Sequence, residues 1–105
     1  MRDLVVIGGG AGGVPAAIRG AQLGGRVAII ECEDLGGLCM NRGCIPFGHM
    51  MAASEILGNM LLGKDMGVDF TGVSKDYSAL IGRQDKIIGL MREGIKGTFS
   101  TSNPE

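Results

Sequence analysis

The chain has 105 residues, a formal net charge of −1 at pH 7 and 45% hydrophobic residues, which suits one small globular domain. Its Lys and Arg residues are scattered, which argues against nucleic acid as a partner, and no apolar run approaches the roughly 20 residues that span a bilayer. Because the start of the sequence also lacks the features of a signal peptide, we expect a cytoplasmic protein without membrane attachment.

A strand and a glycine-rich loop are predicted first. The apolar run Leu4–Ile7 suits a strand that is buried on both faces of a parallel sheet. The glycines that follow satisfy G-x-G-x-x-G, in which Gly8 allows a tight turn, Gly10 a close approach of the backbone to a pyrophosphate, and Gly13 close packing of a helix. The loop is therefore a candidate dinucleotide cradle.

A helix and a second strand complete a βαβ unit. Apolar residues recur at helical spacing over residues 14–23, and a glycine pair then ends the helix. The second strand, Arg26–Glu31, ends in an acid that can accept a hydrogen bond from a ribose 2′-hydroxyl and would repel a 2′-phosphate. We therefore predict a dinucleotide with an unphosphorylated adenosine ribose. The pattern does not separate FAD from NAD. The alternative to dinucleotide binding is a glycine turn with a purely structural role.

Cys39 and Cys44 lie five positions apart, and beside a dinucleotide signature they predict redox chemistry. In a regular helix such residues have Cα atoms roughly 8 to 9 Å apart, whereas a disulfide tolerates at most about 7 Å. The intervening segment must therefore leave helical geometry, and Gly43 is best able to do so. A helix that has Pro46 in its first turn places Cys44 near a helix N-terminus, where the positive end of the dipole lowers the pKa of a thiol.

Other interpretations of these residues stay open. The two thiols could be small buried hydrophobic groups, or half of a zinc site completed by Cys32 and His49, although zinc sites usually have closer cysteine spacings. His49 could be an active-site base, but a lone histidine beside two methionines is more often packed or exposed. We treat Cys32 as structural or incidental, and we predict no metal site.

The remainder is predicted to be mainly helical. Met50–Leu62 belongs to one helix, residues 65–74 form a loop, and a second helix begins at Tyr77. The second helix has an apolar face and a charged face for solvent. The apolar residues are Leu80, Ile87, Met91 and Ile95, and the charged ones are Arg83, Lys86, Arg92 and Glu93. The predicted fold class is α/β, a Rossmann-type βαβ unit followed by a mainly helical redox segment.

The combined pattern resembles the flavoprotein pyridine nucleotide-disulfide oxidoreductases, and most closely the N-terminal part of dihydrolipoyl dehydrogenase. The resemblance runs through residues 3–10, 16–24 and 35–46 and extends more weakly to the end of the chain. It implies that residues 1–105 are the N-terminal portion of an FAD-binding domain, which is incomplete because a doubly wound sheet needs at least a third strand. The NAD and dimer-interface domains of that family are absent from these residues.

The resemblance also implies a function, an FAD-dependent dithiol/disulfide oxidoreductase with NAD as a second substrate. Cys44 would be the thiol beside the flavin, and Cys39 the thiol that exchanges with dihydrolipoamide or another small dithiol or disulfide. The full-length family is expected to form homodimers. The implied cofactor-binding residues are Gly8, Gly10, Gly12, Gly13, Glu31 and Gly37.

Three departures from the family pattern affect this expectation. Leu38 replaces a usual threonine, Phe47-Gly48 replaces a small or hydroxyl residue followed by lysine, and the chain is several times shorter. The lysine would supply a cation that helps to tune the flavin and the thiolate. Two alternatives are therefore a dinucleotide-binding module without turnover and a fragment whose sheet is completed by a partner polypeptide. We expect the chain alone to be marginally stable or to associate, and to bind FAD weakly.

Overall fold

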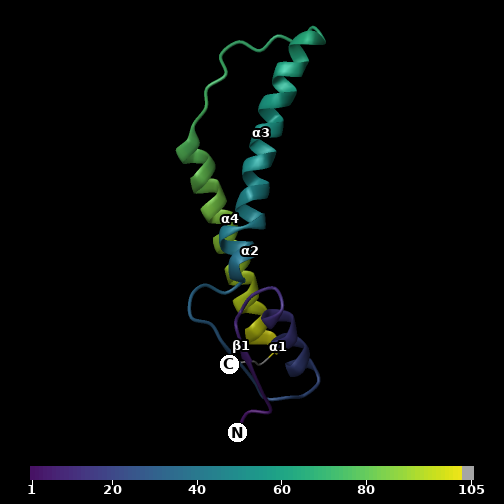
Figure 1. The fold of residues 1–105 in the computed structure, drawn as a ribbon, viewed down its shortest axis with the longest axis vertical. Coiled ribbons are helices and arrows are strands. Elements are labelled where there is room, and N and C mark those ends of the chain that lie inside the picture. The colour runs from purple at the N-terminus through teal and green to yellow at the C-terminus, as the bar shows by residue number, and fades with distance from the viewer. Residues whose placement is uncertain (103–105) are drawn as a thin grey trace.

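The structure, a computed structural model, describes residues 1–102 and consists of a small α/β part and a long helical hairpin (Figure 1). In chain order the elements are β1 (Leu4–Ile7), α1 (Gly13–Gln22), β2 (Val27–Ile30), α2 (Gly37–Arg42), α3 (Cys44–Asp65) and α4 (Tyr77–Ser102). The α/β part lies at one end, and α3 and α4 extend from it to a loop at the far end. The molecule measures 67 × 24 × 19 Å.

The two strands form a parallel sheet, in register from the pair Leu4 and Val27 to the pair Ile7 and Ile30. α1 connects them, and it stops where Gly24 takes a φ of +89° that side chains rarely adopt. The predicted strand–helix–strand order is therefore confirmed. The arrangement is consistent with part of a Rossmann-type domain.

One face of this sheet is covered and the other is open. Leu4 and Val6 lie against glycines of α1. Because side chains alternate along a strand, Val5 and Ile7 project from the opposite face, and these two residues are 50% and 85% exposed. The prediction that β1 is buried on both faces is therefore wrong for this structure, since no layer formed by residues 1–102 covers the second face.

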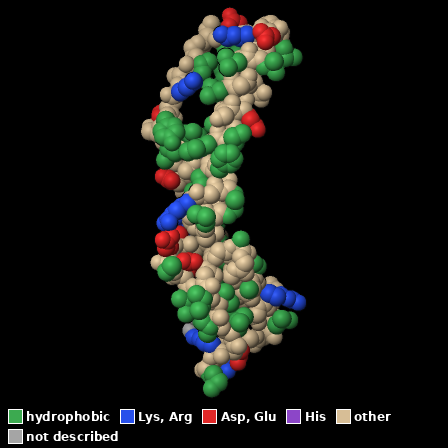
Figure 2. Space-filling view, in the orientation of Figure 1, with side chains coloured by type: hydrophobic (Ala, Val, Ile, Leu, Met, Phe, Trp, Pro, Cys, Tyr) green, Lys and Arg blue, Asp and Glu red, His purple; other side chains and the backbone are tan. Residues whose placement is uncertain are grey.

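The helices predicted for the hairpin are confirmed. α3 runs without a break from Cys44 to Asp65, and it contains both the predicted first turn with Pro46 and the predicted segment Met50–Leu62. α4 begins at Tyr77, as predicted, after a loop over residues 66–76. No residue of α3 is buried, and Figure 2 shows hydrophobic side chains spread along the visible surface of the hairpin.

The molecule is extended for its length. Its radius of gyration is 19.7 Å, against about 13 Å for a compact chain of this size. Its accessible surface is 7307 Å², against about 5600 Å² for a compact protein of this mass. Within residues 1–102, none of the helices combines the length and the apolar character needed to cross a membrane.

The core contacts of α4 differ from the predicted helical face. Ile88 and Phe99 are buried together with residues of α1, β2 and α2, whereas Met91, which was predicted on the apolar face, is 38% exposed. Arg92 was predicted to point into solvent, but its side chain is only 33% exposed because it is bound by α2 and by the loop before it. The periodic pattern of apolar residues in α4 could not show that α2 and the loop before it pack on the charged face of this helix.

Candidate functional site

The glycine loop makes a tight turn between β1 and α1. Gly8 has a φ of +99° and donates its N–H to the carbonyl of Ile30 at 2.8 Å. A Cβ on Gly13, the first residue of α1, would overlap the carbonyl of Gly8, so any side chain there would displace the helix. Gly12, just before the helix, is exposed and has open space around it. The loop therefore brings the N-terminal N–H groups of α1 close to the end of β1, the geometry that suits a pyrophosphate.

The start of α2 packs directly on this loop. A Cβ on Gly37, which has a φ of +68°, would lie 2.7 Å from the Cα of Gly10. The N–H of Gly36 donates to the carbonyl of Gly9 at 2.7 Å. This contact requires a glycine at position 37, because a side chain there would force the two segments apart. The predicted cradle and the cysteine segment are thus parts of one site.

Glu31 lies immediately after β2 and faces the glycine loop. One carboxylate oxygen accepts the N–H of Gly9 at 2.6 Å, and the other accepts the N–H of Glu33 at 2.9 Å. These two backbone donors, that of Glu33 foremost, hold the pKa of the Glu31 carboxyl below its ordinary value. The side chain is therefore ionised near neutral pH, and each oxygen keeps a lone pair for a further donor such as a ribose hydroxyl.

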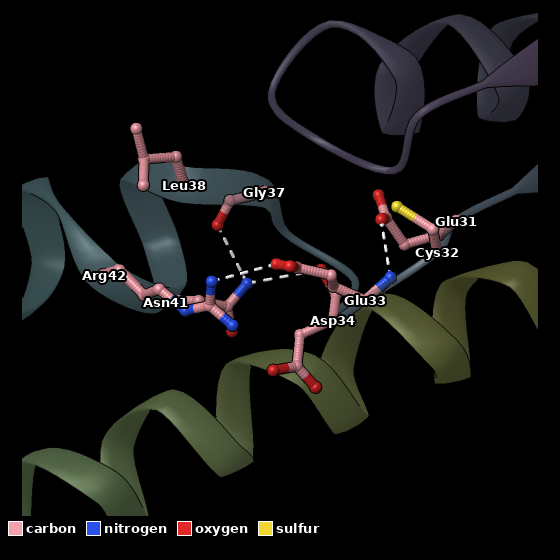
Figure 3. Close-up of a pocket in the computed structure, with 8 residues that line it drawn as sticks. All are labelled: Glu31, Cys32, Glu33, Asp34, Gly37, Leu38, Asn41 and Arg42. Carbon is pink, nitrogen blue, oxygen red and sulfur yellow. Dashed lines mark hydrogen bonds and ion pairs between the residues drawn. The ribbon is translucent and has the colours of Figure 1, made fainter.

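A pocket of about 180 Å³ lies between the loop after β2 and α2 (Figure 3). The loop contributes three acidic side chains, and Arg42 of α2 pairs with one of them, Glu33, at 2.9 Å. Cys32, a free and exposed thiol, also lines this pocket, so it is not partnered with the other cysteines. The concentration of carboxylates disfavours a 2′-phosphate at this end of the site.

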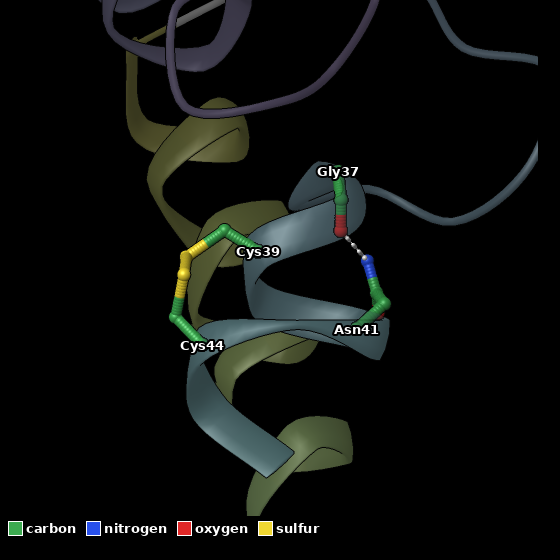
Figure 4. Close-up of a disulfide and its surroundings, with 4 residues drawn as sticks. All are labelled: Gly37, Cys39, Asn41 and Cys44. Atoms are coloured by element: carbon green, nitrogen blue, oxygen red, sulfur yellow. Dashed lines mark hydrogen bonds between the residues drawn. A yellow bond between two sulfur atoms is a disulfide. The ribbon is translucent and has the colours of Figure 1, made fainter. Parts of the chain in front are cut away.

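Cys39 and Cys44 form a disulfide between α2 and the first residue of α3 (Figure 4). Their Cα atoms are 4.8 Å apart, because the backbone at Gly43 leaves helical geometry with φ −128° and ψ −109°. A Cβ on Gly43 would lie 3.2 Å from the Cα of Cys39. The predictions that regular helix does not join the two sulfurs and that Cys44 lies near a helix N-terminus are therefore confirmed, since α3 begins at Cys44.

The disulfide favours the redox interpretation over the other two. Both cysteines are exposed, which does not suit small buried hydrophobic groups. Within residues 1–102, no three His, Cys, Asp or Glu side chains come together in a way that could hold a metal ion. His49 lies 3.2 Å, through Nε2, from the carbonyl of Leu80 and joins α3 to α4, so it is a packed residue.

An apolar groove of about 270 Å³ connects the disulfide to the glycine loop. It is lined by Gly10 and Ala11 of the glycine loop, by Cys39, and by Met91 and Ile95 of α4. One of the two cysteines and the predicted pyrophosphate loop thus line the same groove. An apolar groove of this kind suits a planar organic group better than a charged one.

Three residues at this site were not selected from the sequence. Gly9, an unspecified position of the glycine motif, fixes Glu31 and Gly36 through its backbone. Asn41 binds the backbone at the start of α2 and also the guanidinium of Arg92. The position of Asn41 between the two cysteines was a usable signal, whereas nothing in the sequence indicated Arg92.

Comparison with known proteins identifies the family. The family model described as pyridine nucleotide-disulphide oxidoreductase matches residues 2–101. The chain belongs to this family. The dihydrolipoyl dehydrogenase of Chlamydia muridarum is 42% identical over 100 residues, which are 95% of this chain and 22% of that protein. The dihydrolipoyl dehydrogenase of Bacillus subtilis is 37% identical over 93 residues, which are 89% of this chain and 20% of that protein.

The chain thus spans about a fifth of the length of these relatives. The recognition made from residues 3–10, 16–24 and 35–46 is therefore confirmed. The roles of the individual site residues stay predictions.

Proposed function

We propose that residues 1–105 are the N-terminal portion of an FAD-binding domain in an enzyme of the dihydrolipoyl dehydrogenase type. In this enzyme the pair Cys39 and Cys44 would exchange electrons with dihydrolipoamide or a similar dithiol, and NAD would be the second substrate of a complete homodimer. The observation that carries the proposal is the backbone contact of Gly37 with Gly10, since it ties the cysteine segment to the dinucleotide loop.

The residues present fit FAD. The contact between Gly10 and Gly37 leaves a cradle without side chains, where a pyrophosphate could lie against backbone N–H groups. Gly8, Gly12 and Gly13 would form the rest of the cradle, and Glu31 would accept a ribose hydroxyl. When bound, FAD would supply a group that takes two electrons from the dithiol and passes them to NAD.

The cysteines provide the exchange step. A thiolate of dihydrolipoamide attacks Cys39 Sγ, the bond between the two cysteines breaks, and Cys44 leaves as a thiolate. The second substrate thiol, as its thiolate, then attacks the substrate sulfur of the mixed disulfide, which closes the lipoyl ring and releases Cys39 as a thiolate. Two electrons have moved to the pair. Because Cys44 begins α3, the helix dipole favours its thiolate and makes it the better leaving group.

Thiol counting tests this proposal. The oxidised chain is incubated with dihydrolipoamide, quenched in acid and alkylated, and its mass is measured. We expect two alkyl groups more than in the untreated chain, where Cys32 alone reacts. Cys39→Ser and Cys44→Ser variants are the controls, since neither can form the intramolecular pair. A disulfide that stays closed in excess dihydrolipoamide would contradict the proposal.

A second candidate, a dinucleotide-binding module without turnover, is favoured by one observation. Phe47 is 65% exposed, and Gly48 has nothing within 4 Å of the place where a Cβ would stand. The position where the family usually carries a lysine is therefore open. Equilibrium dialysis with FAD, together with the thiol count, separates the two functions. Bound FAD with a disulfide that stays closed in dihydrolipoamide indicates the binding module, and a disulfide that dihydrolipoamide opens indicates the enzyme.

A further inference from the structure

We propose that Arg92 of α4 is a positioning residue for the Cys39 and Cys44 couple, because it holds the segment between the two cysteines in place when the disulfide is open. This inference rests on the proposed function and adds to it a residue distant in sequence. Arg92 does not contact either sulfur in the hydrogen bonds and ion pairs described for residues 1–102; it acts through Asn41.

One guanidinium binds both ends of the α2 segment. Its Nε donates to Oδ1 of Asn41 at 2.6 Å, and a terminal nitrogen pairs with the carboxylate of Asp34 at 3.1 Å. Asp34 precedes α2 and Asn41 lies near its end. The Arg92 side chain is one third exposed, so these contacts are less screened than those of a fully solvated pair.

Asn41 passes this restraint to the backbone of the redox segment (Figure 4). Its Nδ2 donates to the carbonyl of Gly37 at 2.8 Å and to that of Leu35 at 3.1 Å. With Oδ1 bound to Arg92, both ends of the amide are used and its orientation is fixed. α2 has only six residues, too few for a helix that is stable on its own, so such tertiary contacts decide where Cys39 lies.

The restraint matters most in the reduced state. While the disulfide is closed, the covalent bond itself keeps Cys39 next to Cys44. Once it opens, α2 and α3 remain joined through Gly43, a residue with wide conformational freedom that lets the thiols drift apart. The contact with Arg92 does not depend on the disulfide, so it persists and keeps the thiols opposed.

The equilibrium with glutathione measures this effect. In that reaction the two protein thiols and one glutathione disulfide give the protein disulfide and two glutathione thiols, with two electrons and two protons transferred to glutathione. The equilibrium constant is the effective concentration of one protein thiol at the other. It needs neither flavin nor nicotinamide.

The test uses the 105-residue chain with Cys32→Ser, equilibrated in glutathione mixtures, quenched in acid and alkylated. Arg92→Leu removes both the hydrogen bond to Asn41 and the ion pair with Asp34, and we expect the constant to fall about tenfold, or about 30 mV for a two-electron couple. The constant of Arg92→Lys should lie between those of the parent and Arg92→Leu, because lysine keeps a charge opposite Asp34 without the planar geometry of a guanidinium. The matched control is Lys96→Leu, which removes the same charge from α4 but breaks only a pair with Glu93 in the same helix.

Unfolding in urea is measured on every variant. A purely structural role would lower the stability of Arg92→Leu and leave the glutathione constant unchanged. Constants for both Arg92 variants within about twofold of the parent, or an equal fall in Lys96→Leu, would overturn the inference. If Arg92→Leu does not fold, the glutathione constants of Arg92→Lys and Lys96→Leu are compared instead, and a fall in the first variant alone supports the inference. A parent pair that never equilibrates with glutathione would refute the proposed function itself, and the inference with it.

Discussion

Gly10 and Gly37 are in direct backbone contact: a Cβ on Gly37 would lie 2.7 Å from the Cα of Gly10. The first belongs to the loop predicted to hold a pyrophosphate, and the second begins the helix that carries Cys39. Neither residue has a side chain to occupy the contact. The contact therefore holds the predicted cofactor loop against the helix that carries Cys39 by direct backbone packing.

Gly37→Ala should separate these two segments. The substitution adds a Cβ against the Gly10 backbone at a residue whose φ is +68°, and we expect the free energy of unfolding in urea to fall by at least about 1 kcal/mol. FAD binding in equilibrium dialysis should fall as well. Gly12→Ala is the matched control for stability, because Gly12 has φ −93° and open space, and its unfolding should stay close to that of the parent. Equal losses in both variants would contradict this account.

Glu31 should make the stability of the chain depend on acid pH. Its pKa is lowered from 4.5 in the folded state by the N–H groups of Glu33 and Gly9. A group with a depressed folded pKa stabilises the fold above its unfolded pKa, and the contribution is lost as pH falls through the folded value. Urea midpoints of the parent should therefore decline below about pH 4.5 more steeply than those of Glu31→Gln. The carboxyl of Glu31 should also titrate below 4.5 by NMR, and parallel pH curves would contradict the assignment.

The sequence predicted the local elements well because their signals are local. The turn at Gly8 and the break at Gly43 follow from backbone chemistry within a few residues, and the parallel pairing of the strands follows from the helix that connects them. The burial of β1 was predicted wrongly, because it depends on layers that residues 1–102 do not supply. The contact of Arg92 with Asn41 was also not predictable, since helical periodicity describes one helix and not the segment packed against it.

The open face of the sheet should cause self-association. Val5 is 50% exposed there beside Ile7 at 85%, and both outer strand edges are unpaired within the described residues. We expect the sedimentation coefficient of the parent to rise with concentration and Val5→Lys to reduce this rise. Leu23→Lys, at an exposed site after α1, adds the same charge away from the sheet and should leave association unchanged. A parent that stays monomeric at all concentrations would contradict the prediction.

Gly48→Lys should make the Cys44 thiol more reactive. The two residues are four positions apart in α3 and so lie on the same helix face, and nothing occupies the space around Gly48. A lysine ammonium near Cys44 favours the charged thiolate, so the pKa of the thiol should fall. In a chain that also carries Cys32→Ser and Cys39→Ser, alkylation by iodoacetamide at pH 7 should become about threefold faster.

The matched control for this change is Gly48→Gln, which adds a side chain of similar reach without a charge. It should alkylate at the parent rate, because volume alone does not stabilise a thiolate. Raising the salt concentration should shrink the advantage of Gly48→Lys, since the two groups lie at an exposed helix surface. If both variants gave the same pH profile of alkylation, a cation at this position could not tune Cys44. The absence of the family's lysine would then be no obstacle to the proposed exchange.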